Sequence, residues 1–221
     1  MSAPLAVRQA LVQRLSAGPG DDDLQWARVV MAPFVNRAIG AAHFPIATLL
    51  GAEDAVLLCD GALHIPIFRG LDTTTVLLAA PPPQHVHDTV EGVASQALVA
   101  FGGFVKTIFD MLMPGIVILF DSIQLRGMPN GARSFYVQNP GNLDMHSDNV
   151  WFRMVMHVAG VHAGVRYIGP GEQVIQLQVG EVVLLSGWRR PGVKPTRHAA
   201  PNTDEPRCVA IYDFLVAGSA G

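Results

Sequence analysis

The second half of the sequence is a series of short apolar segments separated by turn residues. Beyond Pro114-Gly115, runs rich in β-branched and aromatic side chains alternate with breaks that contain Pro, Gly and Asn. Because no helical periodicity lies between these runs, the pattern predicts a closed or double-sheet β architecture such as a jelly roll. The expected strands are Ile116–Ser122, Arg133–Gln138, Val150–Val158, Val165–Ile168, Gln173–Val179, Glu181–Ser186 and Arg207–Leu215.

The first half of the sequence predicts mainly helices. Apolar residues recur at helical spacing over Leu5–Leu15, Leu24–Ala41 and Thr89–Met113. The pair Gly102-Gly103 predicts a kink in the last of these helices. We therefore expect a mainly β protein with α-helices, in which a helical or mixed support region (residues 1–113) packs against a jelly-roll core (residues 114–221) within one structural domain.

Composition excludes several classes of protein. Half of the 221 residues are hydrophobic and 15% are charged, which is typical of a folded chain with a large core. The net charge of −3 gives no basis for a nucleic-acid or membrane-surface partner. The most apolar window, Ala97–Phe120, contains Lys106, Asp110 and Pro114, so we expect a buried helix and strand there rather than a membrane span.

Cysteine usage and the start of the chain bear on the compartment. The two cysteines, Cys59 and Cys208, cannot form a disulfide framework. The first residues lack the basic and apolar pattern of a signal peptide. We therefore expect a cytoplasmic protein. The high apolar content also favours a deep pocket or a homodimer interface.

The segment around His146 carries the residues of a metal site. In an extended chain, residues two apart point to the same face, so His146 and Asp148 can approach one ion together. An imidazole and a carboxylate are two members of the two-His, one-carboxylate set that holds non-haem Fe(II) and leaves coordination positions open. His198, in the last turn before the C-terminal strand, is the natural third ligand.

Three further residues accompany this set. Arg207 opens an apolar strand, where a buried cation needs a carboxylate partner; that partner is either a bound ligand or nearby Asp204 or Glu205. Tyr136, on the strand that leads to the metal turn, can reach the same ligand. Arg153 either binds an acidic substrate at the pocket mouth or forms a salt bridge at its rim.

Together, these pieces resemble the Fe(II)/2-oxoglutarate-dependent oxygenases, most closely the prolyl-hydroxylase-like branch. The resemblance covers about eighty residues, and its specificity lies in the joint spacing of the pieces. The first 110 residues match no family in the same way. The matching pieces are Tyr136, His146-Ser147-Asp148, Arg153, the segment Val179–Leu185, His198 and Arg207.

The resemblance implies a fold, two cofactors and a reaction. It implies a double-stranded β-helix in which His146, Asp148 and His198 bind Fe(II) and Arg207 binds the C5 carboxylate of 2-oxoglutarate, with Tyr136 as a further cosubstrate contact. It implies oxidation of an unactivated C–H, with hydroxylation favoured and desaturation or ring formation as alternatives. The compact chain, which shows no evident substrate-recognition module, favours a small molecule as the substrate, such as an amino acid or a biosynthetic intermediate. Dioxygen is consumed, and succinate and CO2 are released. The carboxylate at position 148 disfavours halogenation.

The sequence departs from the family at two places. Val209 stands where some branches have Ser or Thr, and Met154–Val158 replaces a tyrosine-rich strand of many prolyl hydroxylases. Cosubstrate contacts from that strand are therefore not expected, and peptidyl-proline is not implied as the substrate.

Other interpretations remain open at this point. A cupin-like jelly roll would bind a small molecule or a metal without oxidative turnover, although cupins usually carry His-x-His where this chain has His146-Ser147-Asp148. A structural protein would use the apolar helix before Met113 for contacts. His85-Val86-His87-Asp88 is a rival metal pair with no evident third ligand, and His157 is expected in the core. The segment 188–190 is expected to be a solvated loop or a border of the entrance.

Overall fold

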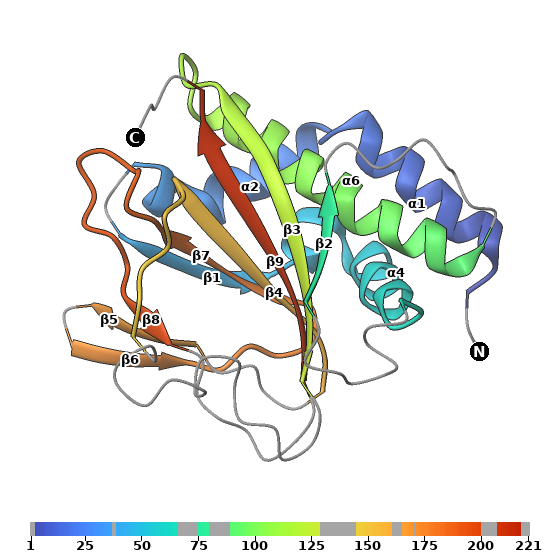
Figure 1. Cartoon of the computed structure of the whole chain (residues 1–221). Helices are drawn as coiled ribbons and strands as arrows, with labels where there is room; N and C mark the ends of the chain where they lie inside the picture. The colour runs from blue at the N-terminus through green and yellow to red at the C-terminus, as the bar shows by residue number, and fades with distance from the viewer. Residues whose placement is uncertain are drawn as a thin grey trace.

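A six-stranded antiparallel sheet forms the centre of the computed structural model, which describes residues 3–36, 39–65, 75–79, 89–128, 145–160, 165–169, 171–199 and 207–217. The strand order is β1-β7-β4-β9-β3-β2. A second sheet, of three strands in the order β6-β5-β8, lies across from it (Figure 1). The large sheet contains β1 (Ala41–Pro45), β2 (Thr75–Ala79), β3 (Ile118–Met128), β4 (Phe152–Gly160), β7 (Glu181–Ser186) and β9 (Arg207–Val216), and the small sheet contains β5 (Val165–Gly169), β6 (Gly171–Ile175) and β8 (His198–Ala199).

Helices cover the face of the large sheet that points away from the small sheet (Figure 1). They are α1 (Leu5–Ala17), α2 (Asp21–Val35), α3 (Ala47–Leu50), α4 (Ala52–Ala62) and α6 (Val90–Leu112). By length and composition α6 is able to cross a membrane, but most of its apolar window is buried inside the protein. The predicted combination of a β core with N-terminal helices packed against it is confirmed at this level, and the strands of the sheet pair antiparallel.

Alternate residues of the central strands supply the core between the sheet and the helices. Phe152 and Phe214 are fully buried, and their rings stack with centroids 4.5 Å apart. Phe109 of α6 packs on Phe152 at 4.1 Å between centroids. Because side chains alternate across a strand, the residues next to Phe152 in β4 and next to Phe214 in β9 face the small sheet instead.

One glycine of the pair in α6 allows close packing. The helix runs unbroken from Val90 to Leu112, past the position where a kink was expected. A Cβ atom added at Gly102 would lie 2.3 Å from the ring of Phe120 on β3, whereas nothing lies within 4 Å at Gly103. Gly102 therefore lets the aromatic ring of β3 approach the helix backbone.

The first part of the chain contributes both edge strands of the large sheet. The helix expected to reach Ala41 ends at Val35, and the chain then forms β1, which pairs with β7. In β1, Ala42 and Phe44 are buried and His43 is exposed, a period of two that suits a strand. The other edge strand, β2, pairs with β3. The strand expected at Arg133–Gln138 lies outside the described residues.

Candidate metal centre

The fold brings together the three residues that the sequence predicts as metal ligands. The ligand atoms of His146, Asp148 and His198 all lie within 4.8 Å of one another. Nε2 of His198 is 3.3 Å from Oδ2 of Asp148, and Nε2 of His146 is 3.7 Å from Oδ1 of the same carboxylate. A single ion can therefore contact two imidazoles and one carboxylate, the donor set that suits Fe(II).

Backbone hydrogen bonds hold the two histidines together across a long separation in sequence. His146 and His198 form an isolated antiparallel bridge, with N–O distances of 2.9 and 2.8 Å. On the other side of the turn, the backbone N–H of Trp188 donates to the carbonyl of Asp148 at 2.9 Å. At Gly187, a Cβ atom would lie 2.1 Å from the carbonyl oxygen of Val150, so this close approach requires glycine.

His198 is ready to act as a neutral ligand. Burial lowers the pKa of His198 from its ordinary 6.5 to about 4, although the neighbouring Asp148 carboxylate opposes this change. Nδ1 of His198 lies 3.3 Å from the carbonyl oxygen of Thr196, to which a protonated Nδ1 donates. That tautomer leaves the lone pair of Nε2 facing Asp148, as metal binding requires.

The two oxygens of Asp148 have different surroundings. Oδ1 accepts a hydrogen bond from Nη1 of Arg153 at 2.5 Å. Oδ2 is buried and has no hydrogen-bond partner among the residues that the structure describes. A buried carboxylate oxygen without a donor is costly, and a cation bound beside His198 removes that cost. Oδ2 is therefore the oxygen that fits a metal ion.

Thr196 connects the centre to the N-terminal half of the chain. Its carbonyl accepts from Oγ of Ser147 at 3.2 Å as well as facing His198. Its hydroxyl donates to the carbonyl of Gly40 at 2.6 Å, and its N–H donates to that of Ser186 at 2.8 Å. One buried residue thus fixes the loop before β8 against both β7 and the segment that precedes β1.

Arg190 anchors the same loop. Its buried guanidinium donates to the carbonyl of Phe34 at the end of α2 and to Oγ of Ser186 at 2.7 Å. It also lies 4.2 Å from the centroid of the Phe34 ring. Of the loop expected at 188–190, Trp188 is exposed but Arg190 is not.

The remaining predicted residues fall into three groups. Tyr136 and the rival pair His85 and His87 lie outside the described residues. Arg207 opens β9, but its side chain is not among those described. His157 is a core residue, with its ring nitrogens 2.8 and 2.9 Å from the carbonyl oxygens of Leu177 and Ala159.

Arg153 forms a salt bridge, one of the two alternatives that the sequence left open. Its partners are Asp148 and Asp213. Sequence reasoning did not single out Asp213, Thr196 or the supporting role of Arg190. A signal existed only for Asp213, because a carboxylate within the apolar run of β9 needs a buried partner.

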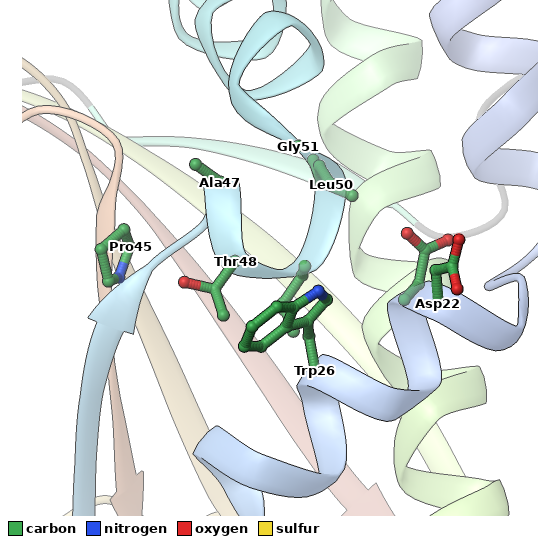
Figure 2. Close-up of a pocket in the computed structure, with 9 residues that line it drawn as sticks. Asp22, Trp26, Pro45, Ala47, Thr48, Leu50 and Gly51 are labelled. Atoms are coloured by element: carbon green, nitrogen blue, oxygen red, sulfur yellow. The ribbon is translucent and has the colours of Figure 1, made fainter.

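A cavity of about 580 Å³ lies elsewhere, between α2, the end of β1 and α3. Figure 2 shows Trp26 of α2 facing Thr48 across it, with Pro45 and Asp22 at its border. It shares no residue with the cluster of His146, Asp148 and His198. The cavity and the cluster are therefore separate sites by their residues.

The fold is shared with solved 2-oxoglutarate/Fe(II) oxygenases. An oxidoreductase of the 2OG-Fe(II) oxygenase family from Burkholderia pseudomallei is 14% identical, with a TM-score of 0.52 over 84% of this chain and 89% of its own. A Pseudomonas putida prolyl-4-hydroxylase is 12% identical, with a TM-score of 0.55 over 91% and 98%. A full-length Neurospora crassa protein in complex with alpha-KG is 14% identical, with a TM-score of 0.51 over 88% and 79%.

Sequence comparison gives no corresponding match. No protein-family model matches the chain, and no curated protein matches it by sequence. The likeness to the solved structures at these identities shows a common fold.

Proposed function

We propose that this chain is an Fe(II)- and 2-oxoglutarate-dependent oxygenase. The observation that carries the proposal is the cluster of His146, Asp148 and His198, in which Oδ2 of Asp148 is buried and has no hydrogen-bond partner among the described residues. The shared fold supports it, and so does the alpha-KG bound to the N. crassa neighbour. In this proposal the two facing sheets form a distorted double-stranded β-helix with the cluster between them.

The proposed ligands each have a defined task. His146, Asp148 and His198 hold Fe(II), which, once loaded with 2-oxoglutarate and dioxygen, supplies the oxidation of a substrate C–H with release of succinate and CO2. His198 binds as a neutral imidazole because Thr196 holds the proton on Nδ1 and burial disfavours a second proton. Asp148 contributes the single protein charge among these three ligands.

Arg207 is proposed to hold the C5 carboxylate of 2-oxoglutarate. Residue 207 opens β9, the strand that also carries Asp213. A guanidinium binds a carboxylate through two parallel hydrogen bonds, which fixes its orientation as well as its position. Tyr136 is proposed as a second contact for the same cosubstrate.

The substrate is proposed to be a small molecule, such as an amino acid or a biosynthetic intermediate, that is hydroxylated in the cytoplasm. The chain carries no basic surplus that would favour nucleic acid. A homodimer is proposed from the high apolar content. The second candidate, a cupin-like binding protein without turnover, is disfavoured because the first pair of ligands is a histidine and an aspartate.

Anaerobic spectroscopy tests the proposal. Fe(II) and 2-oxoglutarate added to the protein should give the weak visible charge-transfer band of a keto acid chelated to iron. We expect the band to vanish in His146→Ala and to weaken strongly in Arg207→Ala, with succinate formed on exposure to air. Arg189→Gln is the matched control, because Arg189 contacts Asn149 in the same turn but none of the three ligands.

The alternatives predict different results. Metal binding without a band and without succinate would favour the cupin-like interpretation. Unchanged succinate formation in Asp148→Ala would contradict the assigned ligand set.

A further inference from the structure

We propose that Arg153 and Asp213 are a positioning pair that fixes Asp148 as a metal ligand through one oxygen, Oδ2. The inference rests on the proposed metal centre and assigns it two residues beyond the three ligands. It also gives Arg153 a role other than gripping an acidic substrate.

The pair is built across two neighbouring strands. Arg153 of β4 and Asp213 of β9 stand opposite each other in the antiparallel register. Nε of Arg153 donates to Oδ1 of Asp213 at 2.6 Å, and Nη2 donates to Oδ2 at 3.0 Å. This two-bond arrangement fixes the plane of the guanidinium.

The third arm of the guanidinium reaches the metal ligand. Nη1 of Arg153 donates to Oδ1 of Asp148, which fixes the rotation of that carboxylate. Oδ2 is then left toward Nε2 of His198, 3.3 Å away. The arrangement allows one carboxylate oxygen to bind the ion and keeps the other engaged with the arginine.

Burial makes the arrangement rigid. The side chain of Arg153 is 11% exposed, and those of Asp148 and Asp213 are 8% and 6% exposed. Water is largely excluded from these groups, so an alternative rotamer of Asp148 would leave a buried charge without its donor. The pair therefore holds the ligand in place before the metal arrives.

Charge explains why two residues are needed. An arginine alone beside Asp148 would neutralise the carboxylate and oppose binding of a dication. Because Asp213 neutralises the guanidinium, the group of three keeps a net charge of −1 for the metal. Arg153 can thus orient Asp148 without reducing the attraction of the centre for a cation.

Mn(II) binding to the whole chain, followed by electron paramagnetic resonance, tests this pair without any cosubstrate. We expect Arg153→Lys, which keeps the charge but loses the fork, to bind Mn(II) about 10- to 100-fold more weakly, the usual effect of losing an outer contact to a metal ligand. Arg153→Gln removes a positive charge, so electrostatics alone would strengthen binding; we expect weaker binding here too. Asp213→Asn should also weaken it, because the guanidinium charge is no longer balanced.

A spectroscopic signature separates positioning from general support of the fold. With Co(II), Arg153→Gln should change the visible absorption spectrum, because Asp148 is freed to bind through both oxygens. Arg189→Gln should leave both the spectrum and the Mn(II) affinity as in the unmodified protein. Thermal unfolding followed by circular dichroism identifies the variants that fold. If an Arg153 variant does not fold, Asp213→Asn provides the test.

The outcomes are distinguishable from those of the proposed function. Wild-type Mn(II) affinity in folded Arg153→Lys and Asp213→Asn would overturn the positioning pair, whether or not the protein is an oxygenase. Weakened Mn(II) binding in these variants supports the pair even if 2-oxoglutarate gives no charge-transfer band.

Discussion

The two faces of the large sheet use the same strands for different purposes. On the helix side, β4 and β9 present Phe152 and Phe214, which are fully buried among other aromatic rings. On the side of the small sheet, Arg153 and Asp213, which are the sequence neighbours of these two phenylalanines, form an ion pair that reaches Asp148. Neighbours in sequence therefore belong to different environments, because a strand alternates its side chains between faces.

The difference teaches how stability and chemistry are separated in this fold. Apolar burial on the helix side supplies a free energy that grows with area. Buried ion pairs on the other side contribute little net stability but fix geometry. Truncation of an aromatic residue on the helix side should accordingly lower the free energy of unfolding and spare metal affinity, whereas substitution within the ion pair should change metal affinity. The following predictions test how strictly this holds.

The largest effect on stability is expected from Phe152→Ala. Phe152 is completely buried and packs on Phe109 at 4.1 Å and Phe214 at 4.5 Å between ring centroids. Truncation of such a residue costs about 3–5 kcal/mol in the free energy of unfolding, as measured by urea denaturation. Mn(II) affinity of the folded fraction should stay the same. A loss of Mn(II) binding free energy as large as the loss in the free energy of unfolding would show that the two faces are coupled.

Arg190→Met should lower the free energy of unfolding by about 2–3 kcal/mol, because the carbonyl of Phe34 and the hydroxyl of Ser186 both lose a buried donor. Urea denaturation measures the loss, and Arg190→Lys should recover part of it. Arg190 connects the end of α2 to Ser186 of β7, next to the loop before β8. A fall in Mn(II) affinity as large as that expected for Arg153→Lys would place this loop in the metal centre rather than in the scaffold.

The pH dependence of the metal-free protein should report His198. Its pKa is about 4 in the folded state and 6.5 ordinarily, so between these values the unfolded chain binds the additional proton. The contribution of His198 to the free energy of unfolding is therefore fully present above pH 6.5. It falls as the pH drops toward 4, with a slope of at most about 1.4 kcal/mol per pH unit. Urea denaturation at several pH values measures the slope. His198→Gln should flatten it, and an unchanged slope would assign it to other groups.

The smallest effect is expected from Tyr212→Phe. The Tyr212 hydroxyl is buried without a hydrogen-bond partner among the described residues, and burial raises its pKa well above 10. Removing a hydroxyl that has no partner should leave stability unchanged or raise it by less than about 1 kcal/mol. Thermal unfolding provides the measurement, and a loss above that size would reveal a hydrogen bond to the hydroxyl.

Much of this arrangement follows from local sequence patterns. The strand expected at Glu181–Ser186 has those bounds as β7, and the helix expected at Thr89–Met113 is α6 with one residue fewer at each end. The convergence of His146, Asp148 and His198 was predicted from strand parity together with a family resemblance. These features depend on residues close in sequence or on a spacing that a family shares.

Features that depend on pairing between distant segments could not be predicted. The ion pair of Arg153 and Asp213 requires knowing that β4 lies beside β9, which no local pattern records. The five residues of β1 follow a helix and carry too short an alternation to be recognised before β7 is placed beside them. Gly102 resembles a helix-breaking residue until Phe120 is seen against it. The roles of Tyr136 and Arg207 remain predictions.

The position of β9 has a consequence for how this chain is made. The last strand of the described chain lies inside the large sheet, between β4 and β3, rather than at an edge. Without Arg207–Val216, no strand joins β1-β7-β4 to β3-β2, so β4 and β3 would each have an unpaired edge. A nascent or prematurely terminated chain thus exposes two hydrogen-bonding edges that invite intermolecular pairing.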